Sequence, residues 1–227
     1  MTMGDVPQHQ ALLTPDELRR LARRHLGRNT PLGKTSSRQL AGKGDHELNP
    51  EMASWLEPGV KYREAAVLVP LVNRTTGLNV LLIQRTEAPD AHGGQIAFPG
   101  GKLEAHDRGP ADAALRETHE ETGLAREFVE VLGFLDAYRT GTRFEIAPVV
   151  ALVEEGFTLV PEPLEVAEIF EVPLAFLMNP ANHRTDSRVW NGKRRHFYAM
   201  PYGERYIWGA TAGILRNMFE RFYGGMK

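Results

Sequence analysis

Residues 98–124 read FPGGKLEAHDRGPADAALRETHEETGL, a glycine-dense segment followed by an uninterrupted helical pattern. We expect a loop and then a helix over about residues 110–122. Three carboxylates of this helix, Glu117, Glu120 and Glu121, fall within five positions. Residues spaced i, i+3 and i+4 share one face of a helix, so the three side chains are predicted to project together.

The rest of this helix predicts an amphipathic element. The arc expected to pack against a sheet holds Ala111, Leu115, Thr118 and Thr122. The carboxylates then lie on the exposed or cleft side, where like charges destabilise a helix by about a few tenths of a kcal/mol per pair. Arg116 stands four residues before Glu120, yet one arginine cannot neutralise three acids. A further cation is therefore expected.

Two interpretations fit a glutamate cluster of this kind. Mg²⁺ takes oxygen ligands and combines a few carboxylates with waters and substrate phosphates. The alternative is a hydrated acidic helix face, because short charge motifs recur by chance. The preceding segment favours the metal: Gly100 and Gly101 would let the backbone approach a metal or phosphate closely, and Asp107 adds an acid in the loop.

The flanking sequence predicts a mixed α/β fold. EAAVLVPLV (64–72) and LNVLLIQR (78–85) are runs of Val, Leu and Ile separated by NRTTG, the pattern of strand, turn and strand. Further strands are expected at 128–138, 144–153 and 194–200, a short helix at 171–179 and a long helix at 206–224. Strands and helices alternate without a regular βαβ period, which favours a mixed sheet sandwiched between helices.

Residues 1–60 are predicted to be an N-terminal extension of a main domain at 61–227. A helix is expected to begin after Thr14 as N-cap, with Pro15 in its first turn and Glu17 completing a capping box. Its arginines are interpreted as a solvated face. Residues 29–58, rich in Gly, Ser, Pro and Lys, predict a loop or mobile linker.

This linker includes GRNTPLGKTSS, which imitates a phosphate-binding P-loop. Gly27 and Gly33 enclose five residues where the P-loop has four, and a helical pattern stands where a buried strand should precede it. Lys34 and Thr35 are therefore interpreted as ordinary loop residues.

Composition excludes several classes of protein. The 227 residues (25.4 kDa) are 42% hydrophobic and 25% charged, which predicts one globular domain or one domain with an extension. A net charge of −2 lacks the basic surplus of duplex nucleic-acid binders, and the absence of cysteine excludes disulfides and Cys-ligated zinc. No stretch has the length of a membrane span, so a soluble, cytoplasmic protein is expected.

The segment GGKLEAHDRGPADAALRETHEETGL resembles the Nudix box, the loop-helix signature of hydrolases that cleave nucleoside diphosphates linked to another moiety. The matching residues are Gly101, Arg116, Glu117, Glu120, Glu121, Gly123 and Leu124. Asp107 stands where Glu is usual, eight residues instead of seven separate it from Arg116, and Thr118 replaces an apolar residue. These departures resemble the coenzyme A pyrophosphatase branch of the family.

A second motif resembles the same branch. In LLIQRTEAPDAHGGQIAFPGG the matching residues are Leu81, Leu82, Arg85, Thr86, Gly94, Phe98, Pro99, Gly100 and Gly101. Asp90 stands where the branch has a second arginine. If that arginine holds the 3′-phosphate or another anionic part of coenzyme A, Asp90 would weaken recognition and could signal another substrate. The resemblance covers about residues 64–218 and implies a Nudix-type α/β/α sandwich.

The resemblance implies a hydrolase dependent on Mg²⁺ or Mn²⁺ that cleaves coenzyme A or acyl-CoA to 3′,5′-ADP and a 4′-phosphopantetheine compound. One alternative is another substrate of the same kind, such as ADP-ribose or NADH. Another is a Nudix-fold module that binds nucleotides without catalysis. The expected partner is a small nucleotide-diphosphate substrate, with no nucleic acid or membrane, and a homodimer is compatible with the sequence.

The same resemblance implies roles for individual residues. Glu117 and Glu121 are the expected direct metal ligands, and the further candidates are the Gly101 backbone, Glu120 and Asp107. Arg116 would orient a carboxylate. The general base could be Glu120, or Glu165 or Glu168 from PLEVAEIFEVP, because no distance decides between them.

Substrate contacts are expected from Arg85, Gly100 and Gly101. Arg85 could reach a phosphate or pair with Glu87 or Asp90. Three aromatic residues, Tyr138, Phe144 and Trp208, could stack on an adenine or belong to the core. His92 and His106 are interpreted as loop residues or substrate contacts, because nothing in their spacing supports a zinc site.

Overall fold

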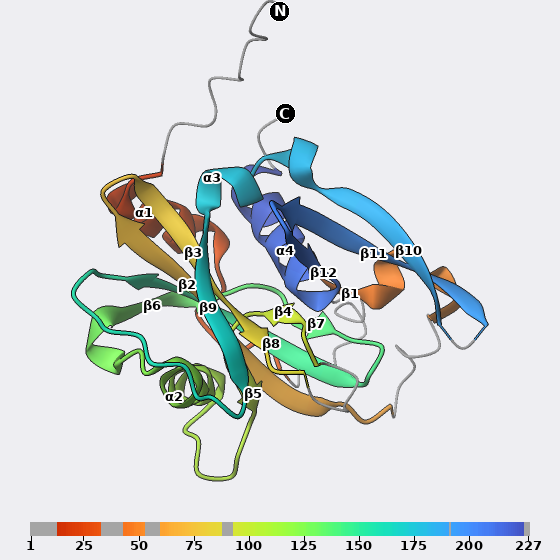
Figure 1. Cartoon of the computed structure of the whole chain (residues 1–227), viewed down its shortest axis with the longest axis horizontal. Coiled ribbons are helices and arrows are strands. Elements are labelled where there is room, and N and C mark those ends of the chain that lie inside the picture. Colours follow the sequence, from red (N-terminus) through yellow and green to blue (C-terminus); the bar gives the residue numbers. More distant parts are fainter. Residues whose placement is uncertain (1–12, 33–42, 53–59, 88–92, 191, 225–227) are drawn as a thin grey trace, which may run out of the picture.

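The structure is a computed structural model that describes residues 13–32, 43–52, 60–87, 93–190 and 192–224. It contains one large mixed sheet with helices on both faces and a smaller antiparallel sheet beside it (Figure 1). The predicted α/β sandwich is therefore confirmed.

The large sheet is built around β2 (Arg63–Arg74). Its longer neighbours are β3 (Gly77–Arg85), β6 (Val129–Phe134), β8 (Phe144–Val153) and β9 (Val166–Pro173). Its short strands are β1 (Lys43–Gly44), β4 (Ile96–Ala97), β5 (Gly100–Lys102) and β7 (Tyr138–Arg139). β2 pairs in parallel with β8 and antiparallel with β3 and β5, so the glycine-dense segment at 100–102 joins the sheet directly.

Alternation along β2 divides the core between two faces. Ala66 and Leu68 pack with Ala113 and Ala114 of helix α2 (Pro110–Thr122). On the other face, Val69 and neighbouring core residues pack against α1 (Pro15–His25), α3 (Leu174–Leu177) and α4 (Ala210–Tyr223). Both faces of β2 are buried, which explains the nearly continuous apolar run in its sequence.

The smaller sheet differs most from the sequence prediction. It consists of β10 (Arg184–Trp190), β11 (Lys193–Tyr202) and β12 (Arg205–Trp208), in that order. The long helix predicted from residue 206 begins only at Ala210, because residues 205–208 pair with β11 and Gly209 has a φ of 65°. The short helix predicted at 171–179 is likewise confined to 174–177, since β9 extends to Pro173.

The N-terminal segment packs on the main sheet. The predicted capping box at Thr14 and Glu17 is confirmed, and Leu18 and Ala22 are buried in the core. Part of the predicted linker is also ordered: β1 pairs with β7, and the Asn49 amide donates to the His196 carbonyl at 2.8 Å. We retain the division at residue 60 as a proposal. The imitation P-loop residues Gly33, Lys34 and Thr35 lie outside the described residues.

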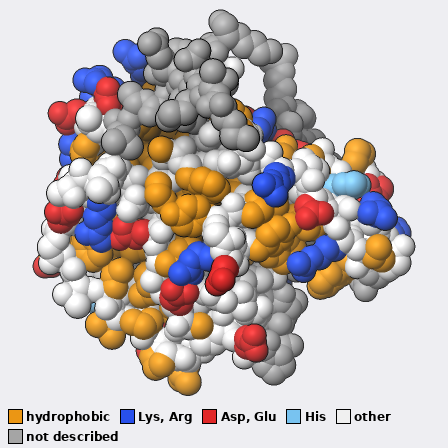
Figure 2. All heavy atoms as spheres, turned by 45° about the horizontal axis from the view of Figure 1, so that its top comes forward, with side chains coloured by type: hydrophobic (Ala, Val, Ile, Leu, Met, Phe, Trp, Pro, Cys, Tyr) orange, Lys and Arg blue, Asp and Glu red, His pale blue; other side chains and the backbone are white. Residues whose placement is uncertain are grey.

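Figure 2 shows lysine and arginine side chains interspersed with aspartate and glutamate over the described part of one face. Within the described ranges, no helix is both long and apolar enough to cross a membrane.

Candidate active site

Two glycines at the start of β5 bring the backbone against α2. A Cβ on Gly101 would lie 2.5 Å from both carboxylate oxygens of Glu117, so glycine lets that side chain keep its present position. Gly100 has a φ of 149°, and a Cβ there would overlap the Ala66 carbonyl of β2. Close approach to Glu117 and to β2 is thus a property of these glycines, and contact with a metal or phosphate stays a prediction.

Helix α2 follows after the loop at 103–109 and has the predicted bounds. Pro110 occupies its first turn, and Gly123 ends it in the left-handed conformation with a φ of 71°. Thr118 and Thr122 are buried, as predicted for the sheet-facing arc. Glu121 is only 2% exposed, which the predicted carboxylate face did not anticipate. Its side chain turns under the start of β5, where the Gly100 N–H donates to it at 2.8 Å.

Glu121 is the most unusual titratable group of this region. Arg85 at the end of β3 donates to its second carboxylate oxygen at 3.2 Å. Burial raises the pKa of Glu121 to about 7; the Gly100 N–H and Arg85 oppose this, while the charges of Glu117 and Glu165 add to it. The negative charge of Glu121 is therefore poorly compensated by its surroundings.

Arg116 links the other acids of the helix. Its Nη1 donates to Glu117 at 3.0 Å and to Glu120 at 2.9 Å. Burial raises the pKa of Glu117, although Arg116 acts in the opposite direction. The Glu120 side chain is 56% exposed, so it is the most solvated of the three carboxylates.

Asp107 anchors Arg116 from the loop. Its two carboxylate oxygens accept from Nε and Nη2 of Arg116 at 3.0 and 3.1 Å, and one also accepts from the Glu104 N–H at 2.8 Å. Hydrogen bonding to Arg116 lowers the pKa of Asp107. These contacts occupy Asp107, so its geometry suits orientation of Arg116 better than direct metal ligation.

The two candidate bases from the β9 region have different surroundings. Glu165 immediately precedes β9, lies 3.9 Å from Arg85 and raises the pKa of both Glu117 and Glu121 through its charge. Glu168 lies on β9, where Arg205 of β12 contacts both of its carboxylate oxygens at 2.7 Å. The structure therefore brings Glu165 to the carboxylate cluster, whereas Glu168 belongs to a separate ion pair.

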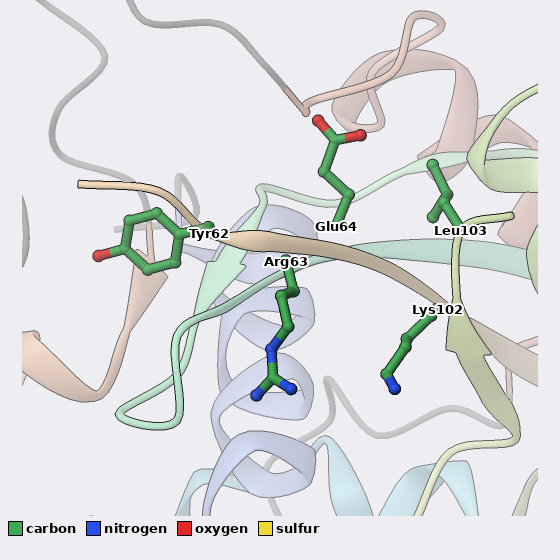
Figure 3. Close-up of a pocket in the computed structure, with 5 residues that line it drawn as sticks. All are labelled: Tyr62, Arg63, Glu64, Lys102 and Leu103. Atoms are coloured by element: carbon green, nitrogen blue, oxygen red, sulfur yellow. The ribbon is translucent and has the colours of Figure 1, made fainter. Parts of the chain in front are cut away.

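A shallow cavity of about 500 Å³ adjoins the motif loop at Lys102, the residue after Gly101. Figure 3 shows the Arg63 and Lys102 side chains extending to one side of their strands and those of Glu64 and Leu103 to the other. Arg63 also stacks over Phe144 at 4.0 Å. Arg63 and Lys102 were not among the predicted site residues, and their signal in the sequence is the position of Lys102 beside the glycines.

The remaining candidate residues from the sequence lie in different parts of the molecule. Tyr138 is buried, and its hydroxyl donates to Asp45 at 2.9 Å, so it belongs to the core. Trp208 lines a second cavity of about 860 Å³ beside β12. His106 is exposed and lies 3.4 Å from Glu104. His92 and Asp90 lie outside the described residues.

The donor set of the cluster fits a hard divalent cation. Among the described residues no three acidic or imidazole groups already converge on one point. The charges of Glu117 and Glu165 nevertheless raise the pKa of Glu121, and two arginines face these three carboxylates: Arg116 contacts Glu117, and Arg85 lies near Glu121 and Glu165. Oxygen ligands with surplus negative charge match the preference of Mg²⁺ or Mn²⁺.

Known families and proteins match much of this chain. The model of the NUDIX domain family matches residues 61–191, more than half of the chain. A protein of Enterobacter sp. named uncharacterized Nudix hydrolase NudL is 35% identical over 173 residues, which is 73% of this chain and 84% of that protein. Its namesake from Klebsiella pneumoniae is 38% identical over 164 residues, 69% and 81% of the two chains. The crystal structure of a MutT protein from Methanosarcina mazei has a TM-score of 0.44 at 19% identity, covering 74% of this chain and 97% of that one.

Proposed function

The chain belongs to the Nudix hydrolase family, and we propose that it hydrolyses the diphosphate linkage of coenzyme A or an acyl-CoA. The expected products are 3′,5′-ADP and a 4′-phosphopantetheine compound. The substrate class is supported by the LLIQR motif of β3, the FPGG motif and the aspartate at position 107, which together resemble the coenzyme A branch.

The observation that carries the proposed chemistry is the state of Glu121. A carboxylate that is 2% exposed and has a pKa of about 7 is costly to hold in its charged form without a nearby cation. Glu117 and Glu165 increase that cost. This arrangement is explained if a divalent ion binds there together with the substrate diphosphate.

We propose that Glu117, Glu121 and the Gly101 carbonyl hold the ion. Such an ion, Mg²⁺ or Mn²⁺, would neutralise phosphate charge and lower the pKa of a bound water. Arg116 would keep Glu117 and Glu120 in position, because Asp107 fixes its guanidinium at two points. Arg85 would be available to a phosphate oxygen once the charge of Glu121 is compensated.

The base is assigned to Glu165, with Glu120 as the competing candidate. Hydrolysis forms a bond between water oxygen and one phosphorus and breaks the bond from that phosphorus to the bridging oxygen. The proton leaving the water needs an ionised acceptor within hydrogen-bond reach. Glu165 is 54% exposed and faces the cluster, whereas Glu120 is occupied by Arg116 at 2.9 Å.

The substrate is tested by incubating the purified chain separately with coenzyme A, ADP-ribose and NADH, each with Mg²⁺ or Mn²⁺. Mass spectrometry should detect 3′,5′-ADP from coenzyme A, and none with EDTA or in Glu121→Gln. Cleavage of only ADP-ribose or NADH would retain the metal chemistry and reject the coenzyme A assignment. Nucleotide binding without any product would instead favour the non-catalytic module.

The base is tested with Glu165→Gln, Glu120→Gln and Glu168→Gln. We expect Glu165→Gln to lower kcat by about 100-fold or more. Glu168→Gln is the matched control from the same segment, and its kcat should fall far less. The largest loss of kcat in Glu120→Gln would transfer the assignment to Glu120.

A further inference from the structure

The cavity of about 860 Å³ beside β12 is lined by aromatic, amide and charged side chains. Its walls come from β3, β9, β10, β12, the β11–β12 turn and the segment 93–96, and its aromatic residues are Trp190, Tyr202, Tyr206 and Trp208. A volume of this order suits a cofactor-sized ligand. The carboxylate cluster does not include any of these aromatic residues.

The indole of Trp190 has an unusual position. Trp190 is 58% exposed at the end of β10, although large aromatic side chains usually bury most of their surface. Trp208 is fixed by Phe197, whose ring lies 4.9 Å away, and Tyr206 is fixed by its 2.6 Å hydrogen bond to Asp186. One exposed indole thus stands beside two immobilised rings, which is a geometry suited to receiving a planar ring.

The charges in the cavity favour a ring with one phosphate over a polyanion. Arg205 and Glu168 neutralise each other, and Glu204 adds a negative charge. Arg188 stacks over Trp208 at 4.8 Å and its charge acts on Asp186, but no salt bridge joins it to a carboxylate among the described residues. One guanidinium is therefore available beside the aromatic walls.

Strands β3 and β9 join this cavity to the carboxylate cluster. Arg85 contacts Glu121, while its neighbour Gln84 lines the cavity. On β9, Glu168 pairs in register with Gln84, and Glu165 lies three residues before it, near the cluster. Neighbouring positions on β3 and β9 therefore belong to the carboxylate cluster and to the cavity.

We propose that this cavity binds the adenine of the substrate, with its ring on Trp190 and a 3′-phosphate on Arg188. The Gln84 carboxamide would supply the donor and acceptor pair that matches an adenine edge. The identity of the ligand rests on the proposed function, whereas the stacking site rests on the cavity alone. Stacking of a base on an indole is a strong and sequence-tolerant contact.

Binding of 3′,5′-ADP without metal tests the proposal separately from catalysis. Two of the three tryptophans line the cavity, so quenching of tryptophan fluorescence reports on it. Trp190→Ala should raise the Kd for 3′,5′-ADP by about tenfold or more. Val189→Ala is the matched control, because Val189 is 67% exposed on the same strand and does not line the cavity. Equal Kd values for Trp190→Ala and the wild type would overturn the stacking site.

The phosphate contact is tested by comparing 3′,5′-ADP with adenosine 5′-monophosphate. The wild type should prefer 3′,5′-ADP, and Arg188→Gln should remove the preference by weakening only 3′,5′-ADP. If Arg63→Ala and Lys102→Ala remove the preference instead, the 3′-phosphate belongs to the cavity of Figure 3 and our assignment of Arg188 is wrong. Should coenzyme A not be cleaved at all, Trp190-dependent binding of either nucleotide would still support the stacking site.

Discussion

Asp107 and Glu121 are two carboxylates of one loop-helix motif with nearly equal exposure and opposite pKa shifts. Their side chains are 1% and 3% exposed. The pKa of Asp107 is lowered, whereas that of Glu121 is raised to about 7. Exposure alone therefore does not explain the difference.

The surroundings of the two groups do explain it. Asp107 lies near the surface beneath the guanidinium that covers it, and it receives two hydrogen bonds from Arg116 and one from Glu104. Glu121 lies deeper, receives one hydrogen bond from Arg85 and one from Gly100, and faces two further acids. One carboxylate is fully compensated by the protein, and the other is left for an external cation. This contrast separates a positioning acid from a candidate metal ligand.

The largest effect is expected from Glu121→Gln, which removes the charge that the protein leaves uncompensated. Its Oε1 can still accept from the Gly100 N–H, so the fold should be retained while the charge is lost. We expect kcat/KM to fall by more than about 100-fold, which exceeds the usual effect of removing a residue that only orients a metal ligand. Thermal unfolding should show that Mg²⁺ no longer raises Tm. Metal-dependent turnover at the wild-type rate would remove Glu121 from the site.

The adjacent glycines separate function from folding. In Gly101→Ala the new methyl group meets the flexible end of Glu117. We expect a loss of activity of about 10- to 100-fold, as when a residue that orients a metal ligand is removed, and little change in Tm. In Gly100→Ala the methyl group meets the backbone of β2 at a φ of 149°, which should destabilise the fold by about 2–4 kcal/mol. Denaturant unfolding should therefore show a much lower unfolding free energy for Gly100→Ala than for Gly101→Ala, and equal values would contradict the geometry.

A third prediction concerns stability without metal. The folded pKa of Glu121 is about 7 and its unfolded value is about 4.5, so the folded state binds more protons between these values. Stability contributed by the protonated group is present below pH 4.5 and is lost as pH rises through 7, by up to about 3 kcal/mol. In EDTA, unfolding free energies measured from pH 5 to 8 should fall, and Glu121→Gln should flatten that component. Added Mg²⁺ should restore stability at pH 8.

The sequence could predict the motif and much of the fold because their signals are local. Helix α2 has the bounds predicted for residues 110–122, and the β2 and β3 runs form the predicted strands. The burial of Glu121 could not be read from helical periodicity, because it depends on β5 lying over the helix end. The ion pair of Glu168 with Arg205 was likewise hidden, since residues 205–208 read as helix and form a strand only by pairing with β11.

The smallest expected effect is that of replacing Asp107, the carboxylate whose charge Arg116 compensates. Asp107→Asn keeps the shape of the side chain but removes the charge that holds Arg116 at two points. Because Asp107 acts through Arg116, we expect about a tenfold loss of kcat with KM nearly unchanged. The pH-dependent stability of Glu121 should persist in this variant, since Asp107 contacts neither Glu121 nor Arg85 among the hydrogen bonds of the described residues. Arg116→Lys, which cannot reproduce the bidentate contact, should have a similar effect on kcat. Loss of the Mg²⁺-induced rise in Tm in Asp107→Asn would instead make Asp107 a direct ligand and erase the distinction between the two carboxylates.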